Sequence, residues 1–390
     1  MKLYEFEGKN LFKKVGIATP RSFLVSNPQQ FEEIPVDFVP VVVKVQALSG
    51  NRAARGGIVR CTSLKEIKAN VQNFLGSDFG EERVSSVLVE EEIHKEKEYY
   101  LSVTFDTSVR SPVLLISTKG GTGVATFEER FILDPFEDFT QEKATRLLKN
   151  INFPPSSAAL VVRLVGLFYE YDCRLAEINP LTWDGYAFWA LDAKVILDDA
   201  ALYRHPDLSF SPRSSSGKPP TKAEIDAHTI DENDHRGVAG SVYFDLDGDI
   251  GILASGGGGS LVALDGVLSA GGKPANYTEY SGNPPFEKVY ALTTIVLSKR
   301  GLHGLLIAGA IANFTDIQET LRGVLQALRD HKPHTTFPIV IRRAGPRDKE
   351  AFEMLRDAGQ KEGFDLHLFG EETPIDTAAK LVVEFSKKHH

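Results

Sequence analysis

The apolar positions in the second half of the chain predict strands that alternate with helices. Three short apolar runs are expected to be strands, namely Asp249–Ala254, Leu305–Ala308 and Phe337–Ile341, and each is followed by a glycine-containing loop and a helical segment. After the second strand, apolar residues recur at helical spacing at positions 317, 321, 324, 325 and 328. Such alternation is typical of a doubly wound, mainly parallel sheet, in which ligands bind at the carboxyl ends of the strands. We therefore expect the three loops to meet at one edge of the sheet.

The first half follows a different pattern. Expected strands are Val39–Val45, Ser86–Glu90, Tyr99–Phe105 and Pro112–Ser117, and expected helices are Glu7–Val15 and Ala158–Glu170. Strands that are widely separated in the chain and flanked by helices are typical of an α+β domain.

The two halves are joined by a polar stretch. From His205 to Arg236 the sequence is rich in Ser, Pro and Asp, and Pro212–Pro220 lies at its centre. This composition can bury little apolar surface and favours an exposed connection. We expect a first domain at 1–205, a polar linker at 206–236 and a second domain at 237–388.

Composition restricts the class of partner and the cellular setting. The formal net charge is −9, from 44 basic and 53 acidic residues, which argues against nucleic acid or an anionic membrane as the main partner. The two cysteines, Cys61 and Cys173, form no disulfide framework and no metal-ligand spacing, as expected for a reduced, cytoplasmic protein. The N-terminus has no apolar signal core, and no uncharged apolar run is long enough to span a membrane.

A lysine within a strand precedes a glycine-rich loop in the first half. Lys44 lies in Val41–Gln46, and the loop Ser49–Gly57 follows, with Gly50 and Arg52 in it. Glycines let backbone N–H groups approach phosphate oxygens, and a lysine on a strand supplies a fixed cation. An ordinary basic hairpin turn would explain the same segment, and it is neither a Walker A motif nor a dinucleotide fingerprint.

Carboxylates follow the next predicted strand. Glu90 and Glu91 end Val87–Glu91, and Glu98 lies eight positions after Glu90. A carboxylate at a strand end can accept a hydrogen bond from an adenine amino group, and a later one can accept from ribose hydroxyls. Solvated acidic loops are common, so this signal is weak alone.

A hairpin carries the stronger signal. Glu177–Leu181 and Leu191–Lys194 flank Trp183–Gly185, which reads as a turn. The turn would bring Asn179 and Asp192 side by side, and one neutral and one anionic oxygen ligand suit Mg²⁺. The alternative is an ordinary hairpin with a capping asparagine.

Taken in order, these motifs resemble the ATP-grasp half of the succinyl-CoA synthetase beta subunit. The motifs that carry the resemblance are Tyr4–Lys9, Val41–Gln46 with its loop, Val87–Glu90, Lys97–Leu101, Ser117–Gly121, Glu177–Leu181 and Leu191–Lys194. The second half resembles ATP-citrate lyase and citryl-CoA synthetase more closely, through the segments Gly256–Ser260, Ala275–Gly282, Ile311–Thr315 and Arg342–Pro346. The resemblance implies an α+β ATP-grasp domain followed by an α/β flavodoxin-like ligase domain.

The resemblance also implies roles for residues in the first half. Lys44, Gly50 and Arg52 would bind phosphates. Residues implied for adenine and ribose are Glu90, Glu91, Ile93 and Glu98. Asn179 and Asp192 would bind Mg²⁺. Glu177 and Lys44 are the implied catalytic residues, and Glu177 would orient a phosphorylated histidine. The glycine loop has Asn51 and two alanines where the family often has glycine, so ATP and GTP are not distinguished.

In the second half, the resemblance implies a citrate site. The implied residues are Gly257, Gly258, Ser281, Gly282, Asn313, Phe314, Thr315 and Arg343. Citrate has three carboxylates and a hydroxyl, and Asn313, Thr315 and Arg343 would supply an amide, a hydroxyl and a bidentate guanidinium. The helix N-terminus after Thr315 would add N–H groups for an anion.

Two parts of such an enzyme are missing from the sequence. It contains no Gly-His-Ala-Gly histidine loop and no CoA-binding domain, and His303 reads as a turn residue. The resemblance therefore implies a hetero-oligomer, in which a second subunit supplies the phosphohistidine, the CoA site and, in a lyase, the domain that cleaves citryl-CoA. The function that the resemblance implies is therefore that of a subunit of an ATP-dependent citrate–CoA ligase, which binds Mg-ATP and citrate, phosphorylates the partner's histidine and forms citryl phosphate. The alternatives are a subunit of the same chemistry acting on succinate or malate, and a non-catalytic nucleotide- or citrate-binding sensor.

Overall fold

The computed structural model describes residues 1–80, 82–121, 129–151, 153–210, 213, 220–232 and 234–388. The chain divides into two compact units, Met1–Pro219 and Pro220–His390. Most of the centre of the expected linker, residues 211–212 and 214–219, lies outside the described residues.

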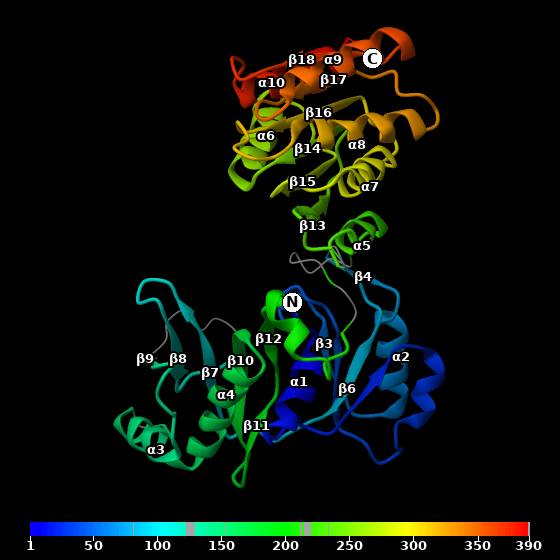
Figure 1. Cartoon of the computed structure of the whole chain (residues 1–390). Coiled ribbons are helices and arrows are strands. Elements are labelled where there is room, and N and C mark those ends of the chain that lie inside the picture. Colours follow the sequence, from blue (N-terminus) through cyan, green and yellow to red (C-terminus); the bar gives the residue numbers. More distant parts are fainter. Residues whose placement is uncertain are drawn as a thin grey trace. The chain divides into compact units, whose positions relative to one another are not determined.

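The first unit is built on two antiparallel sheets (Figure 1). The first sheet has the order β1-β6-β2-β3, from β1 (Ser22–Val25), β6 (Val87–Glu91), β2 (Val41–Val45) and β3 (Ile58–Cys61). Helix α2 (Leu64–Phe74) packs against it through Ile67 and Val71. A two-stranded ribbon, β4 (Asp78–Phe79) and β5 (Glu82–Arg83), follows α2 in the chain.

The second sheet of this unit has the order β11-β10-β7-β8-β9, and β12 also pairs with β10. Its strands are β7 (Lys97–Asp106), β8 (Ser111–Ser117), β9 (Glu129–Ile132), β10 (Cys173–Trp183), β11 (Phe188–Ala190) and β12 (Lys194–Leu197). Its core also includes side chains of α1 (Glu5–Lys14), α3 (Gln141–Asn150) and α4 (Ala158–Glu170). The expected α+β architecture is confirmed, and α4 has the bounds that its apolar periodicity predicts.

The second unit contains a six-stranded sheet of order β13-β15-β14-β16-β17-β18. The strands are β13 (Val238–Asp245), β14 (Ile250–Ser255), β15 (Asn276–Ser281), β16 (Gly304–Gly309), β17 (Ile339–Arg342) and β18 (Leu366–Phe369). Only β13 is antiparallel to its neighbour. Without β13, the order is that of a flavodoxin-like sheet, as expected, with the switch in chain direction between β14 and β16.

Helices cover both faces of this sheet (Figure 1). One face packs against α6 (Gly257–Ser269) and α10 (Ile375–Ser386), and the other against α7 (Phe286–Leu297), α8 (Ile317–Asp330) and α9 (Asp348–Glu362). Because two helical layers bury both faces, the central strands are almost wholly apolar, and β14 and β16 are buried at every position.

The polar stretch differs from expectation in its second part. Residues Lys222–Thr229 form a helix, α5, which begins with a capping box between Thr221 and Glu224. Its Ala227 is fully buried in the core of the second unit. A capping box and one small buried residue stabilise a helix without an extended apolar face, which is why apolar periodicity does not reveal it.

Candidate functional site

A cleft of about 950 Å³ opens in the first unit. Its walls come from both sheets of the unit and from the loop after β2. All of the nucleotide, metal and catalytic residues expected from the sequence line it, namely Lys44, Gly50, Arg52, Glu90, Glu91, Ile93, Glu98, Glu177, Asn179 and Asp192. Residues that are up to 148 positions apart therefore share one cavity.

Lys44 lies at the floor of this cleft between two buried carboxylates. Its Nζ is 2.8 Å from Glu5 Oε1 and 2.7 Å from Glu90 Oε1, and it also donates to the Leu191 carbonyl at 2.6 Å. Burial opposes the charged form, but the attraction of Glu5 and Glu90 outweighs it, so the pKa of Lys44 is raised. The amine is therefore a permanent cation.

Two further cations complete this buried network. Lys9 forms ion pairs with Glu5, at 2.7 Å, and with Glu90, and burial lowers the pKa of Lys9. Arg52 lies 2.6 Å from Glu5 and 2.8 Å from Asp192. Three cations thus face three carboxylates, which compensates much of the cost of removing each charge from water.

Sequence reasoning assigned no role to Glu5 or Lys9. Both lie on α1 and are almost fully buried, and their i, i+4 spacing places them on one face of the helix, in line with Phe12. A charged pair on an otherwise apolar helix face is the signal that could have found them. The partner of Lys9, Glu90, lies 81 positions away, so its identity is not a local property of the sequence.

The hairpin expected around Trp183 is present. Strands β10 and β11 pair antiparallel with Leu181 opposite Ala190, and the Leu191 N–H donates to the Pro180 carbonyl at 3.1 Å. Continuing this register places Asn179 opposite Asp192. In the turn, Asp184 accepts from the N–H groups of Tyr186 and Ala187, both at 2.8 Å, which explains the tight reversal.

The chemistry of Asn179 and Asp192 fits a hard cation. Asn179 Oδ1 accepts a hydrogen bond from the Gly121 N–H at 2.7 Å, so the second lone pair of this oxygen can still bind a cation. Asp192 Oδ1 accepts from Arg52 at 2.8 Å and from the Ala193 N–H at 2.7 Å, while the side chain is about one third exposed toward the cleft. Each residue therefore keeps acceptor capacity for a cation such as Mg²⁺.

Glu177 is held by a tyrosine that sequence reasoning missed. The Tyr100 hydroxyl lies 3.0 Å from Glu177 Oε2 and 3.1 Å from Ser102 Oγ. Burial, followed by the charge of Glu177, raises the pKa of Tyr100, so its hydroxyl keeps its proton. Lys194 Nζ is 3.9 Å from the same carboxylate. Strand pairing explains the arrangement, since Glu177 lies opposite Ser102 in β10 and β7.

The remaining carboxylates of the cleft differ in exposure. Glu90 is buried and engaged by Lys9 and Lys44, whereas Glu91, at the end of β6, is exposed. Glu98 is half-buried and pairs with Lys95 at 2.9 Å. Ile93 is also half-buried. Of the three carboxylates expected to contact base and ribose, Glu91 and Glu98 are thus more accessible than the buried Glu90.

In the second unit, the predicted citrate residues follow the carboxyl ends of neighbouring strands. Gly257 and Gly258 begin α6 after β14, Ser281 ends β15 and Gly282 follows it, and Asn313–Thr315 follow β16. Helix α6 has no side-chain cap, and its N-cap residue Gly256 has a φ of 80°, a conformation that favours glycine. No N-cap side chain therefore accepts from the first N–H groups of α6, and the nearest carboxylate oxygen given there, Glu279 Oε2, lies 3.2 Å from where a Cβ of Gly257 would stand.

Arg343 lies at the same edge, directly after β17. It is fully buried, and no hydrogen-bond acceptor for its Nε, Nη1 or Nη2 is found among the described residues. Its guanidinium crosses Gly309 at the end of β16, where a Cβ would stand 1.9 Å from Nη1. The neighbouring Arg342 instead donates to the carbonyls of Gly309 and Thr373, at 2.6 and 2.7 Å.

The three predicted residues of the loop after β16 differ in exposure. Thr315 is buried, but Asn313 and Phe314 are exposed. The N-terminus of α8 already has an anion of its own, because the Asp316 carboxylate caps it by accepting from the Glu319 N–H at 2.9 Å and also pairs with Arg347 at 2.8 Å. The expected anion site at this helix end is therefore occupied by the protein, and the N-terminus of α6 remains.

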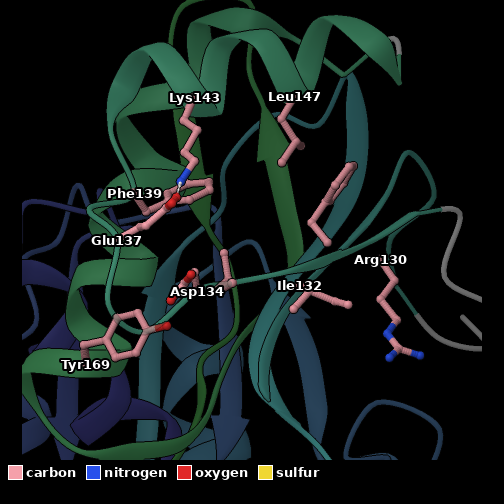
Figure 2. A pocket seen from close by; sticks show the side chains of 10 residues that line it. Arg130, Ile132, Asp134, Glu137, Phe139, Lys143, Leu147 and Tyr169 are labelled. Atoms are coloured by element: carbon pink, nitrogen blue, oxygen red, sulfur yellow. Dashed lines mark hydrogen bonds and ion pairs between the residues drawn. The ribbon is translucent and has the colours of Figure 1, made fainter. Parts of the chain in front are cut away.

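A second pocket, of about 340 Å³, lies beside β9, α3 and α4 (Figure 2). Lys143 reaches from α3 toward Glu137 and pairs with it at 2.6 Å. None of the residues expected for nucleotide, metal or acid lines this pocket. Within the described part of the chain, no helix is long and apolar enough to cross a membrane.

Comparison with known proteins identifies the families of the two domains. Residues 2–183 match the family model of the ATP-grasp domain, and residues 221–384 match that of the ATP citrate lyase citrate-binding domain. A succinate–CoA ligase [ADP-forming] subunit beta from Desulfurococcus amylolyticus is 32% identical over 374 residues, which cover 92% of this chain and 94% of the relative. A succinate–CoA ligase [GDP-forming] subunit beta from Thermus thermophilus is 31% identical, and the match covers 98% of each chain.

Among solved structures, the fold is shared with ATP citrate lyase from Methanothrix soehngenii in complex with citrate and coenzyme A. The TM-score is 0.79 at 24% identity, and the match covers 98% of this chain and 99% of the other. The chain therefore belongs to the family of the succinate–CoA ligase beta subunits, with an ATP-grasp domain followed by a domain that matches the ATP citrate lyase citrate-binding model.

Proposed function

We propose that this chain is the nucleotide- and citrate-binding subunit of an ATP-dependent citrate–CoA ligase. The observation that carries the choice of acid is Arg343, a buried guanidinium without a hydrogen-bond partner among the described residues, inside a domain that matches a citrate-binding family. A cation so far from water requires an anionic partner, and its planar donors match a carboxylate.

In this proposal the cleft of the first unit binds ATP. Lys44 and the N–H groups around Gly50 would contact the phosphates, and the available carboxylates of Glu91 and Glu98 would accept from the ribose and base. Glu90 takes a different role from the one first expected. It would hold Lys44 in place, because its carboxylate is already shared by Lys44 and Lys9.

Asn179 and Asp192 would hold Mg²⁺, which would neutralise phosphate charge and orient the terminal phosphate for transfer. Glu177, held by Tyr100, would orient the histidine that accepts the phosphoryl group. Phosphoryl transfer depends mainly on positioning and electrostatics, so a small set of fixed charges can supply most of the catalysis.

A second subunit would complete the enzyme in this proposal. It would bring the phosphorylated histidine and the CoA site, and the phosphoryl group would pass to citrate before CoA attacks citryl phosphate. If the partner also carries a lyase domain, the products become acetyl-CoA and oxaloacetate. The assembly would be a hetero-oligomer, with this chain acting in a cytoplasmic enzyme.

Calorimetry with the full chain tests the acid assignment. Citrate should bind in the absence of a partner, and Arg343→Gln should weaken binding by at least about 100-fold, because it removes a charge-assisted bidentate contact. For catalysis, the natural complex should transfer label from γ-labelled ATP to a partner histidine, and Asp192→Asn should abolish transfer. Wild-type chain that binds succinate but not citrate would reject the assignment.

Succinate or malate is the second candidate acid. The curated relatives that match nearly the whole chain are named succinate–CoA ligases, which favours it. Exposed Asn313 and Phe314 lie where a longer acid could be contacted, and their replacement separates the two acids. Asn313→Ala should reduce citrate affinity and leave a shorter dicarboxylate unaffected.

A further inference from the structure

Two buried side chains in the second unit have polar atoms without a protein hydrogen-bond partner. Arg343 and Tyr280 are the two largest fully buried side chains among the described residues. The Tyr280 hydroxyl and all three guanidinium nitrogens of Arg343 find no partner in the described part of the protein. Leaving one buried polar group unsatisfied is costly, and two such groups in one place call for a common explanation.

The two side chains face each other although their strands are not neighbours. Tyr280 is the penultimate residue of β15 and Arg343 follows β17, and β14 and β16 lie between them in the sheet. The Arg343 Cζ is nevertheless 5.7 Å from the centre of the Tyr280 ring. Gly309 makes this approach possible, since any Cβ there would clash with the guanidinium.

Arg343 has no carboxylate partner among the described residues, although Glu371 and Glu372 act on the neighbouring Arg342. Arg342, adjacent in sequence, bonds to backbone carbonyls, and burial together with Arg343 lowers the pKa of Arg342. Arg343 itself has no ion pair among the described residues, so a bound anion would compensate its charge directly.

We propose that Tyr280 is a substrate-binding residue whose hydroxyl donates to the acid carboxylate that Arg343 binds. This inference rests on the proposed function and adds a residue to it. A guanidinium presents its donors in one plane, and a carboxylate bound there keeps lone pairs outside the fork. A phenol beside the guanidinium is placed to satisfy one of them.

The inference makes two opposite predictions for Tyr280→Phe in the full-length chain. Without ligand, the variant should unfold at the same or a higher temperature, because it loses a buried hydroxyl that no protein group satisfies. With citrate, affinity measured by calorimetry should fall by about 10- to 100-fold, the range expected for a hydrogen bond to a charged group. A purely structural role would lower the unfolding temperature without a selective loss of affinity.

Tricarballylate and inorganic phosphate serve as further probes. Tricarballylate keeps the carboxylates of citrate and lacks its hydroxyl, so the loss caused by Tyr280→Phe should be equal for both acids. The matched control is Tyr243→Phe, because Tyr243, on β13, is buried in the same apolar cluster as Tyr280. The Tyr243→Phe variant should bind citrate with the affinity of the wild type. An equal loss of phosphate binding in Tyr280→Phe would overturn the carboxylate assignment.

Failure of this inference can be told apart from failure of the proposed function. If the wild type binds citrate, Arg343→Gln abolishes binding and Tyr280→Phe has no effect, the role of Tyr280 is wrong while the citrate assignment stands. If the wild type binds only succinate, with the predicted loss in Tyr280→Phe, the acid is wrong and the role of Tyr280 stands. If the wild type binds no carboxylic acid, both are wrong.

Discussion

Gly309 and Arg343 fit together so closely that position 309 cannot carry a side chain while Arg343 keeps its place. A methyl group at position 309 would stand 1.9 Å from Arg343 Nη1 and 2.7 Å from Ser255 Cβ. The absence of a side chain at the end of β16 therefore determines where the guanidinium lies, and with it the location of the proposed anion site.

Replacement of Gly309 by alanine should consequently remove acid binding. The Arg343 side chain would have to leave its position, and the expected loss of citrate affinity is at least about 10-fold by calorimetry. Gly359→Ala, on α9 of the same unit, is a suitable control because its Cβ would meet only ordinary contacts of 3.4 Å or more. Unchanged citrate affinity in Gly309→Ala would contradict the placement of Arg343.

The contact between Tyr100 and Glu177 predicts a kinetic effect. In the natural complex, Tyr100→Phe should lower the rate of phosphoryl transfer from ATP by about 10-fold, because Glu177 loses its hydrogen bond. The KM for ATP should change little, since Tyr100 does not line the nucleotide cleft. Tyr99→Phe, the adjacent core position on β7, should leave the rate unchanged, and a purely KM effect in Tyr100→Phe would argue against a positioning role.

The buried network under the cleft predicts a dependence of stability on pH. Burial opposes ionisation of Glu5, but Lys44, Lys9 and Arg52 outweigh it and hold the pKa of Glu5 well below its usual value. The unfolded chain therefore takes up this proton at a higher pH than the folded chain does. The stabilisation is complete above about pH 4.5 and is lost as the pH falls through the folded pKa.

Glu5→Gln tests this relation by urea unfolding at several pH values. The variant should be less stable at neutral pH by roughly 3–5 kcal/mol, since buried cations lose a partner. The difference from the wild type should narrow toward acid pH. Glu142→Gln, an exposed position in the first turn of α3, should have no comparable effect. A difference that is constant with pH would exclude an ionic role for Glu5.

The cysteines should be unreactive in the folded protein. Burial, with a smaller contribution from Asp172, raises the pKa of the Cys173 thiol to about 12. Burial also raises the pKa of the Cys61 thiol. Since the thiolate is the reactive form, iodoacetamide at neutral pH should modify neither residue before unfolding and both after it, as read by mass spectrometry. Rapid labelling of native Cys173 would show that its site opens to solvent.

Local patterns account for the parts of the fold that sequence predicts well. The periodicity of α4 and the apolar runs of β14 and β16 are properties of a few adjacent residues, so their existence and approximate bounds follow directly. Helix α5 is not predicted from the pattern of apolar residues, because its stability comes from a capping box and one buried alanine. Hydrophobic patterning carries no comparable information for such a segment.

Residues of the candidate sites could be predicted from the sequence only where they belong to a recognisable motif. Lys44 and Asp192 lie in recognisable segments, whereas the pairing of Lys9 with Glu90 depends on how α1 packs against β6, which no local window contains. The same holds for Tyr280, whose environment is made by a glycine and an arginine from two other strands. Non-local contacts of this kind require the three-dimensional structure.

The balance of charge around Lys44 has a consequence for the order of events during binding. Glu5 and Glu90 already neutralise the Lys44 amine. A triphosphate would therefore not meet an unpaired cation at this position. Under the proposed function, the triphosphate would compete with these carboxylates for Lys44, and Lys9 and Arg52 would remain to compensate the two carboxylates. Nucleotide entry would then exchange one anion for another at Lys44.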